Sequence, residues 1–155
     1  MTMKKVLIAL DYNHAADKVA ETGYKLARTM RADIMLVHVI TEPAYYAMDF
    51  SPVMGYEGAY TNGTVAVAED IKKDAESFLT AFVNYLDDKR IQTKVLEGDT
   101  TESILNYSEE WGADLIVMGS HSHKGISGLF VTDIAAHVLK HSKIPLLAIP
   151  TDDNK

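Results

Sequence analysis

Residues 114–150 read DLIVMGSHSHKGISGLFVTDIAAHVLKHSKIPLLAIP, and this stretch decides the fold. An apolar run at 115–118 stops at Gly119, and a second run at 145–149 closes the stretch. Between them lie a polar, glycine-dotted segment and then apolar residues at helical spacing: Val131, Ile134, Ala135, Val138 and Leu139. The order is strand, loop, helix, strand. In a parallel sheet, the loop after a strand and the start of the next helix are the usual site for an anionic ligand.

The rest of the chain continues this alternation of strands and helices. Apolar runs predict three more buried strands, at 6–10, 34–40 and 92–96. Apolar residues at helical spacing predict two helices, over 14–30 and 71–86. Asp99, with Glu102 three residues later, predicts the start of another helix, and Gly112 its left-handed end. The order β-α-β-α-β-α-β-α-β predicts an α/β fold, a parallel sheet with helices on both faces.

One connection is unusually long. Residues from 41 to about 65 show no clear period and hold two prolines, three glycines and four tyrosines. Such a connection is usually a functional or mobile loop. Its tyrosines either fix a surface loop in place or form a lid or partner surface over the carboxyl edge of the sheet. Residues 1–150 are predicted to form a single domain, and the short tail at 151–155 is predicted to fray.

Composition narrows the function classes. The net charge is −7 and no basic stripe is present, which disfavours nucleic-acid binding. A small phosphorylated ligand stays compatible, because backbone N–H groups can bind phosphate. No apolar run approaches the roughly 20 residues of a membrane span. The chain has no cysteine, which excludes disulfides and thiol catalysis and fits a reducing cytoplasm, the location we expect.

Several well-known site motifs are missing. A P-loop needs Gly-x4-Gly-Lys-Ser/Thr, but Lys124 precedes Gly125 here. A dinucleotide fingerprint needs glycines after the first strand, where Asp11 and Tyr12 stand instead. A receiver domain would need an acidic pair at that place, and no Gly-x-Ser-x-Gly nucleophile elbow occurs anywhere. We therefore predict no catalytic residues.

Ordinary structural roles explain the histidines better than a metal site does. His121 and His123 lie in the loop after the fourth strand, and His137 and His141 are one helical turn apart. A zinc site needs a third or fourth ligand, and no fixed cluster of acids or cysteines joins these pairs. His38 is expected to pack within a strand. We predict no metal site, while His121, His123 and Lys124 could supply positive charge to a phosphate tail.

The residues quoted so far resemble the universal stress protein family over essentially the whole chain. Four blocks carry the resemblance: 7–11 (LIALD), 36–39 (LVHV), 114–121 (DLIVMGSH) and 138–147 (VLKHSKIPLL). The resemblance implies a Rossmann-like sheet of five parallel strands in the order 3-2-1-4-5, similar to the adenine nucleotide alpha hydrolases. It also implies a site for an adenine nucleotide.

The nucleotide motif of that family is Gly-x2-Gly-x9-Gly-Ser/Thr. Its first glycine matches Gly119, its second falls on Ser122, and its final pair falls on Thr132 and Asp133. The spacing is therefore kept, while two glycines and the small hydroxyl are lost. Ser122 gives up the positive φ and the close backbone approach that glycine allows, but it keeps a hydroxyl donor.

Other expected contacts lie at the ends of the strands. The resemblance places the ribose at Asp11 and the adenine pocket at Val39, and Ala9 stands where proline is frequent. Met118 and His121, on either side of the glycine motif's start, complete the expected cofactor-binding residues.

Asp133 decides between two hypotheses. Thr132 suits an N-cap, which puts Asp133 in the first turn, where the helix dipole favours a carboxylate. If the Asp133 carboxylate faced a phosphate ~4 Å away, the electrostatic repulsion would cost about 4 kcal/mol at an effective dielectric of ~20. That outweighs one or two hydrogen bonds of about 1 kcal/mol each. Pointing away, it would leave the backbone N–H groups usable. The chain either binds ATP or another adenine nucleotide, with Mg²⁺ only on that nucleotide, or keeps the fold as a dimeric interaction module.

Partners are expected at two places. The strand at 146–149 is predicted at the sheet edge, where an apolar strand invites pairing with another chain, so we expect a homodimer. An unidentified protein partner could use the loop at 41–65, and neither nucleic acid nor a membrane is expected. Related nucleotidyl transferases carry His-x-Gly-His, which is missing here. We expect no enzyme, and slow ATP hydrolysis stays open as a side activity.

Overall fold

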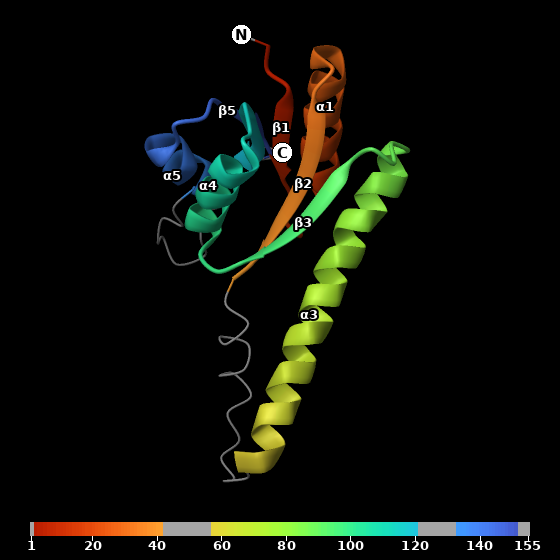
Figure 1. Cartoon of the computed structure of the whole chain (residues 1–155), viewed down its shortest axis with the longest axis vertical. Helices are drawn as coiled ribbons and strands as arrows, with labels where there is room; N and C mark the ends of the chain where they lie inside the picture. Colours follow the sequence, from red (N-terminus) through yellow and green to blue (C-terminus); the bar gives the residue numbers. More distant parts are fainter. Residues whose placement is uncertain (1, 42–56, 121–132, 152–155) are drawn as a thin grey trace.

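The computed structural model describes residues 2–41, 57–120 and 133–151, with the backbone alone for 57–66. Figure 1 shows strands and helices alternating along these ranges. In chain order they are β1 (Lys5–Ala9), α1 (Ala16–Met30), β2 (Asp33–Ile40), α3 (Glu57–Leu86), β3 (Gln92–Glu97), α4 (Thr100–Trp111), β4 (Leu115–Ser120), α5 (Ile134–His141) and β5 (Leu146–Pro150).

The five strands form one parallel sheet in the order β3-β2-β1-β4-β5, which confirms the predicted fold class. Strand β1 lies at the centre, with Ile8 paired to Leu36 of β2 on one side and to Val117 of β4 on the other. From β1, the chain adds β2 and β3 on one side of the sheet and β4 and β5 on the other. The gap beyond the carboxyl ends of β1 and β4 is therefore the topological switch point, where open α/β sheets bind their ligands.

Helices cover both faces of the sheet, and successive strand residues divide between the two cores. Helices α1 and α3 lie on one face, and α4 and α5 on the other (Figure 1). Because neighbouring strand residues point to opposite faces, Ile8 packs with the first pair of helices and Leu7 with the second. Because helices bury both faces of the sheet, the sequences of the strands are continuous apolar runs.

Helix α1 approaches the sheet closely at Gly23. A Cβ at this position would lie 2.8 Å from Ile8 Cδ1 and 3.2 Å from Val117 Cγ1, both in fully buried side chains. A larger residue would push α1 away from β1 and β4. The missing side chain therefore allows the middle of α1 to pack closely against β1 and β4.

Helix α4 has the ends that the sequence predicts. The Asp99 carboxylate accepts the backbone N–H of Glu102 at 2.9 Å, as an N-cap does. At the other end Gly112 has a left-handed φ of 76°. Both signals are local, so neighbouring residues suffice to predict them.

Helix α3 begins earlier than the sequence predicts. Its buried residues match the expected period, with Ala75, Leu79 and Phe82 at 0%, 0% and 8% exposure. The predicted loop, however, reaches to about 65, whereas the helix already starts at Glu57 and extends beyond the sheet (Figure 1). Glycines and β-branched residues weaken the helical signal over 57–65. Elongating an existing helix is far easier than nucleating one. Residues 57–65 therefore extend the helical turns that pack against the sheet.

No described helix, the 30-residue α3 included, combines the length and the apolar character needed to cross a bilayer. The rest of the predicted loop, at 42–56, lies outside the described residues.

The described residues end at Thr151, which is bonded to the sheet. Thr151, assigned to the tail, is only 5% exposed, and its hydroxyl donates to the Ser120 carbonyl at 2.7 Å. Its backbone N–H lies 3.3 Å from the same oxygen. Because Ser120 ends β4, this contact joins the end of the described chain to the site.

Candidate functional site

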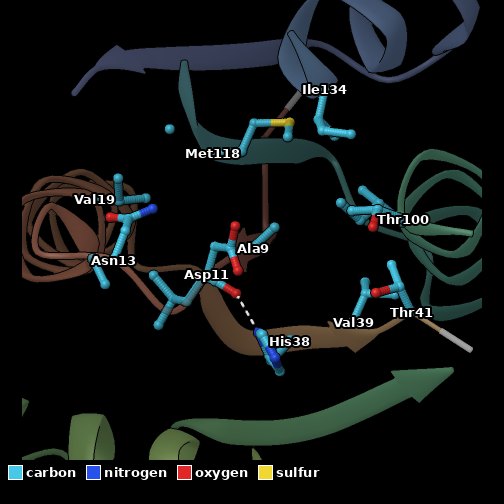
Figure 2. Close-up of a pocket in the computed structure, with 14 residues that line it drawn as sticks. Ala9, Asp11, Asn13, Val19, His38, Val39, Thr41, Thr100, Met118 and Ile134 are labelled. Atoms are coloured by element: carbon cyan, nitrogen blue, oxygen red, sulfur yellow. Dashed lines mark hydrogen bonds between the residues drawn. The ribbon is translucent and has the colours of Figure 1, made fainter. Parts of the chain in front are cut away.

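A cavity of about 270 Å³ lies at the carboxyl ends of β1, β2 and β4. Ala9 and Asp11 lie in its middle, between Met118 of β4 and Val39 of β2 (Figure 2). Its volume is just below the roughly 300–1,000 Å³ of pockets for drug-sized molecules. The described walls therefore suit a small ligand.

Apolar side chains form the inner walls. Ala9, Val39 and Met118 come from three neighbouring strands, and Ile104 of α4 and Val19 of α1 close the sides. Their side chains offer no strong hydrogen-bonding group. This part of the cavity can hold a flat, uncharged group such as a heterocyclic base.

Asp11 is the acidic side chain among the described lining residues. It follows β1, and its Oδ1 accepts the backbone N–H of Tyr12 at 2.8 Å. Its own carbonyl accepts the N–H of Asn13 at 2.8 Å, which forms a tight turn. The turn holds an exposed carboxylate at the mouth, where it can accept hydrogen bonds from ligand hydroxyls.

Asn13 connects that turn to α1. Its side-chain oxygen accepts the Ala15 N–H at 2.9 Å, and its carbonyl accepts the Ala16 N–H at 3.1 Å. The polar rim is therefore built from the same contacts that start the helix.

His38 lies beneath the cavity in β2 and is 5% exposed, which confirms its predicted packing within a strand. Its Nδ1 lies 2.8 Å from the Leu10 carbonyl, drawn as the dashed line in Figure 2. A carbonyl only accepts hydrogen bonds, so Nδ1 carries a hydrogen. The ring of Tyr12 packs on the imidazole with centroids 4.3 Å apart, and Phe78 lies behind at 5.5 Å. These contacts fix the floor of the cavity.

Asp133 directly precedes the lining residue Ile134, and it corrects the predicted start of α5. The sequence favours Thr132 as the N-cap, whereas Asp133 takes that role, with its Oδ1 accepting the Ala135 N–H at 3.0 Å. Its Oδ2 accepts the Ser120 hydroxyl at 3.0 Å. Both residues suit an N-cap, so the choice depends on this long-range bond to the end of β4.

The structure brings five of the expected site residues to one cavity: Ala9, Asp11, Val39, Met118 and Gly119. Asp133 borders it through its neighbour Ile134. His121, Ser122 and Thr132 lie outside the described residues, as do His123 and Lys124.

Sequence reasoning missed three polar lining residues, Asn13, Thr41 and Thr100. Thr41 directly follows β2, and Thr100 opens the helix after β3. Parallel strands end at the same edge of a sheet, so applying that rule to every strand would have found them.

Histidine and carboxylate side chains do not gather into a metal centre within residues 2–41, 57–120 and 133–151. His141, one turn after His137, places its Nδ1 2.9 Å from the His137 carbonyl. This contact is internal to α5 and suits the end of a helix.

A second hollow, of about 400 Å³, lies at the opposite edge of the sheet. Three of its charged residues pair with one another. Arg90 donates to both carboxylate oxygens of Asp88 at 2.9 and 2.8 Å, and Arg28 lies 3.6 Å from the same group. The Tyr24 hydroxyl also donates to Asp88, and burial, followed by the Asp88 charge, raises the pKa of Tyr24. This network stabilises the amino edge of the sheet, and we place the site at the carboxyl edge.

Comparison with known proteins identifies the family. A sequence profile of the universal stress protein family matches residues 2–150. The chain belongs to the universal stress protein family. Among relatives in this family, universal stress protein MJ0577 of Methanocaldococcus jannaschii is 27% identical over 155 residues, covering 94% of both chains.

Solved structures of universal stress proteins share the fold. The structure of MJ0577 covers 99% of this chain and 100% of its own, with 19% identity and a TM-score of 0.72. A universal stress protein in complex with cAMP covers 98% and 100%, with 16% identity and a TM-score of 0.62. The protein from Archaeoglobus fulgidus in complex with dAMP covers 96% and 99%, with 17% identity and a TM-score of 0.59.

Proposed function

We propose that this protein binds an adenine nucleotide in the cavity beyond β1, β2 and β4, and that it acts as a regulatory binding protein. The observation that carries the proposal is the meeting of an apolar slot and the Asp11 carboxylate at the switch point of the sheet. A base and a ribose need these two surfaces side by side. The proposed output is a change in contacts with a partner rather than turnover.

Each part of the ligand has a proposed place. Adenine would lie between Val39 and Met118, over Ala9, where its flat faces lose contact with water. The ribose hydroxyls would donate to Asp11, a bond strengthened by the charge of the acceptor. Gly119 lies where the sugar leads toward phosphate, at the side bounded by α5.

Two relatives support an adenine ligand, since their solved structures hold cAMP and dAMP. ATP is the other candidate. Its Mg²⁺ would arrive on the phosphates, because no group of three potential metal ligands converges in the described ranges.

Replacing Asp11 tests the ribose contact. We expect Asp11→Ala to weaken AMP binding about 10- to 100-fold, which corresponds to losing a hydrogen bond to a charged acceptor. Asp74→Ala, which removes another exposed carboxylate, on α3, should leave the dissociation constant unchanged. Isothermal calorimetry measures both. Equal effects of the two substitutions, or no heat with wild-type protein at millimolar AMP, would rule out this site.

We also propose that the protein forms a homodimer through β5. This strand lies at the sheet edge, and Leu139 of the neighbouring α5 is 62% exposed. An unpaired apolar edge invites pairing with a second copy. The proposed dimer contact through β5 is compatible with both hypotheses, a nucleotide-binding protein and a ligand-free interaction module. Asp133, engaged at the start of α5, is the observation that favours the second of these.

Sedimentation velocity tests the dimer. We expect wild-type protein to sediment as a dimer and Ala148→Asp, which places a charge at an exposed position of β5, to sediment as a monomer. Ala81→Asp, at an exposed position of α3, should remain dimeric. A wild-type monomer at every concentration would contradict the proposal.

A further inference from the structure

We infer that Asp133 makes the cavity selective for adenine ligands with at most one phosphate and disfavours ATP. The inference rests on the proposed adenine site and adds the class of ligand that the site accepts.

The position of the Asp133 carboxylate is fixed at both oxygens. One accepts the Ala135 N–H and the other accepts the Ser120 hydroxyl, each at 3.0 Å. Ser120 is held in turn, because its carbonyl accepts the Thr151 hydroxyl at 2.7 Å. Moving the carboxylate away would break both of its bonds and leave the first turn of α5 without its cap.

This carboxylate borders the proposed site. Ser120 directly follows Gly119, and Asp133 directly precedes Ile134, and both of these neighbours line the cavity. In Figure 2 Ile134 lies beside Met118, and Val39 lies across the cavity from both. A nucleotide with its base toward Val39 would direct its phosphates toward Ser120 and Asp133.

The start of α5 would otherwise attract phosphate. A helix N-terminus carries about half a positive charge together with unpaired N–H groups, which together bind anions. Here a full negative charge from the chain itself already occupies that position. The described lining contains Asp11 and neither lysine nor arginine, while His121, His123 and Lys124 lie outside the described residues.

Charge therefore separates the candidate ligands. Adenosine, which has no phosphate, is unaffected by the repulsion, and AMP places two charges at the end of the cavity. ATP adds about two more, and its longer tail must pass the Asp133 carboxylate.

Two substitutions remove the charge and keep the cap. Asn is as good an N-cap as Asp, and Ser is nearly as good, so Asp133→Asn and Asp133→Ser should both fold. In Asp133→Asn the amide oxygen can accept the Ala135 N–H, and its NH₂ can donate to Ser120. Asp74→Asn removes the same charge from an exposed position on α3 and is the matched control.

The experiment is a calorimetric titration of the wild type and the three variants with adenosine, AMP and ATP. Thermal melting of each variant verifies the fold. We expect wild-type protein to bind AMP at least about tenfold more tightly than ATP. Asp133→Asn and Asp133→Ser should strengthen ATP binding about tenfold, AMP binding less, and adenosine binding not at all. Asp74→Asn should change none of the three.

Three outcomes would overturn the inference. A wild-type protein that binds ATP more tightly than AMP, or Asp133 variants that change all three ligands equally, would show that Asp133 does not select by charge while leaving the adenine site in place. Wild-type protein that binds none of the three ligands would reject the proposed function, and this inference with it.

Discussion

Ala9→Phe should abolish nucleotide binding, weakening it more than about 100-fold. Ala9 ends β1 in the middle of the cavity, so a phenyl ring there would take the space proposed for adenine (Figure 2). The ring would enter empty space rather than a packed core, and the protein should keep its fold. Calorimetry with AMP measures the loss, and circular dichroism verifies the fold.

Ala9→Ser is the matched control for this substitution. It changes the same residue but adds only one oxygen atom, so AMP should bind within about threefold of wild type. If Ala9→Phe folded normally and still bound AMP with wild-type affinity, the ligand could not lie over β1. The proposed position of the base would then be wrong.

Leu79→Ala should lower the free energy of unfolding by about 2–5 kcal/mol. Leu79 is fully buried in the core between α3 and the sheet, and truncating it removes apolar contact and leaves a void. A loss of this size is a large part of the 5–15 kcal/mol typical of whole domains. Urea unfolding monitored by circular dichroism measures it.

Leu139→Ala makes the same chemical change at a position that is 62% exposed. If the chain is isolated, we expect this substitution to lower the free energy of unfolding by less than about 0.5 kcal/mol. Equal losses at Leu79 and Leu139 would contradict the described packing of a single chain. A concentration-dependent loss at Leu139 alone would instead show that a second copy covers α5.

The sequence was sufficient for the parts of the fold that depend on local signals. Parallel strands buried on both faces become continuous apolar runs, which is why the run at 115–118 identified β4. The cap at Asp99 and the left-handed turn at Gly112 depend on neighbours a few residues away. The strand order followed from the family resemblance rather than from any of these patterns, and the structure confirms it.

Features set by distant contacts could not be predicted. Asp133 caps α5 instead of Thr132 because Ser120, 13 residues earlier, donates to it. Thr151 is buried because it bonds to the end of β4, 31 residues away. The early turns of α3 have weak helical propensity, and they continue a helix that packing stabilises further along the chain.

For the candidate site, too, some features could be predicted from the sequence and others could not. Asp11, Val39 and Gly119 could be proposed from strand ends and from the resemblance, and the structure places them around one cavity. The direction of the Asp133 carboxylate depends on a side-chain conformation, which the sequence leaves open. Under our proposal, that direction distinguishes a site for small adenine ligands from one for ATP.

An NMR titration tests the central claim most directly. In ¹⁵N–¹H spectra of the full chain, added AMP should shift the amide signals of Leu10, Asp11, Thr41 and Gly119, which lie at the carboxyl ends of β1, β2 and β4. The signals of Arg31 and Asp33, at the opposite edge, should stay in place. Shifts centred on Arg31 and Asp33, or no shifts at millimolar AMP, would contradict the claim that this cavity is an adenine-nucleotide site.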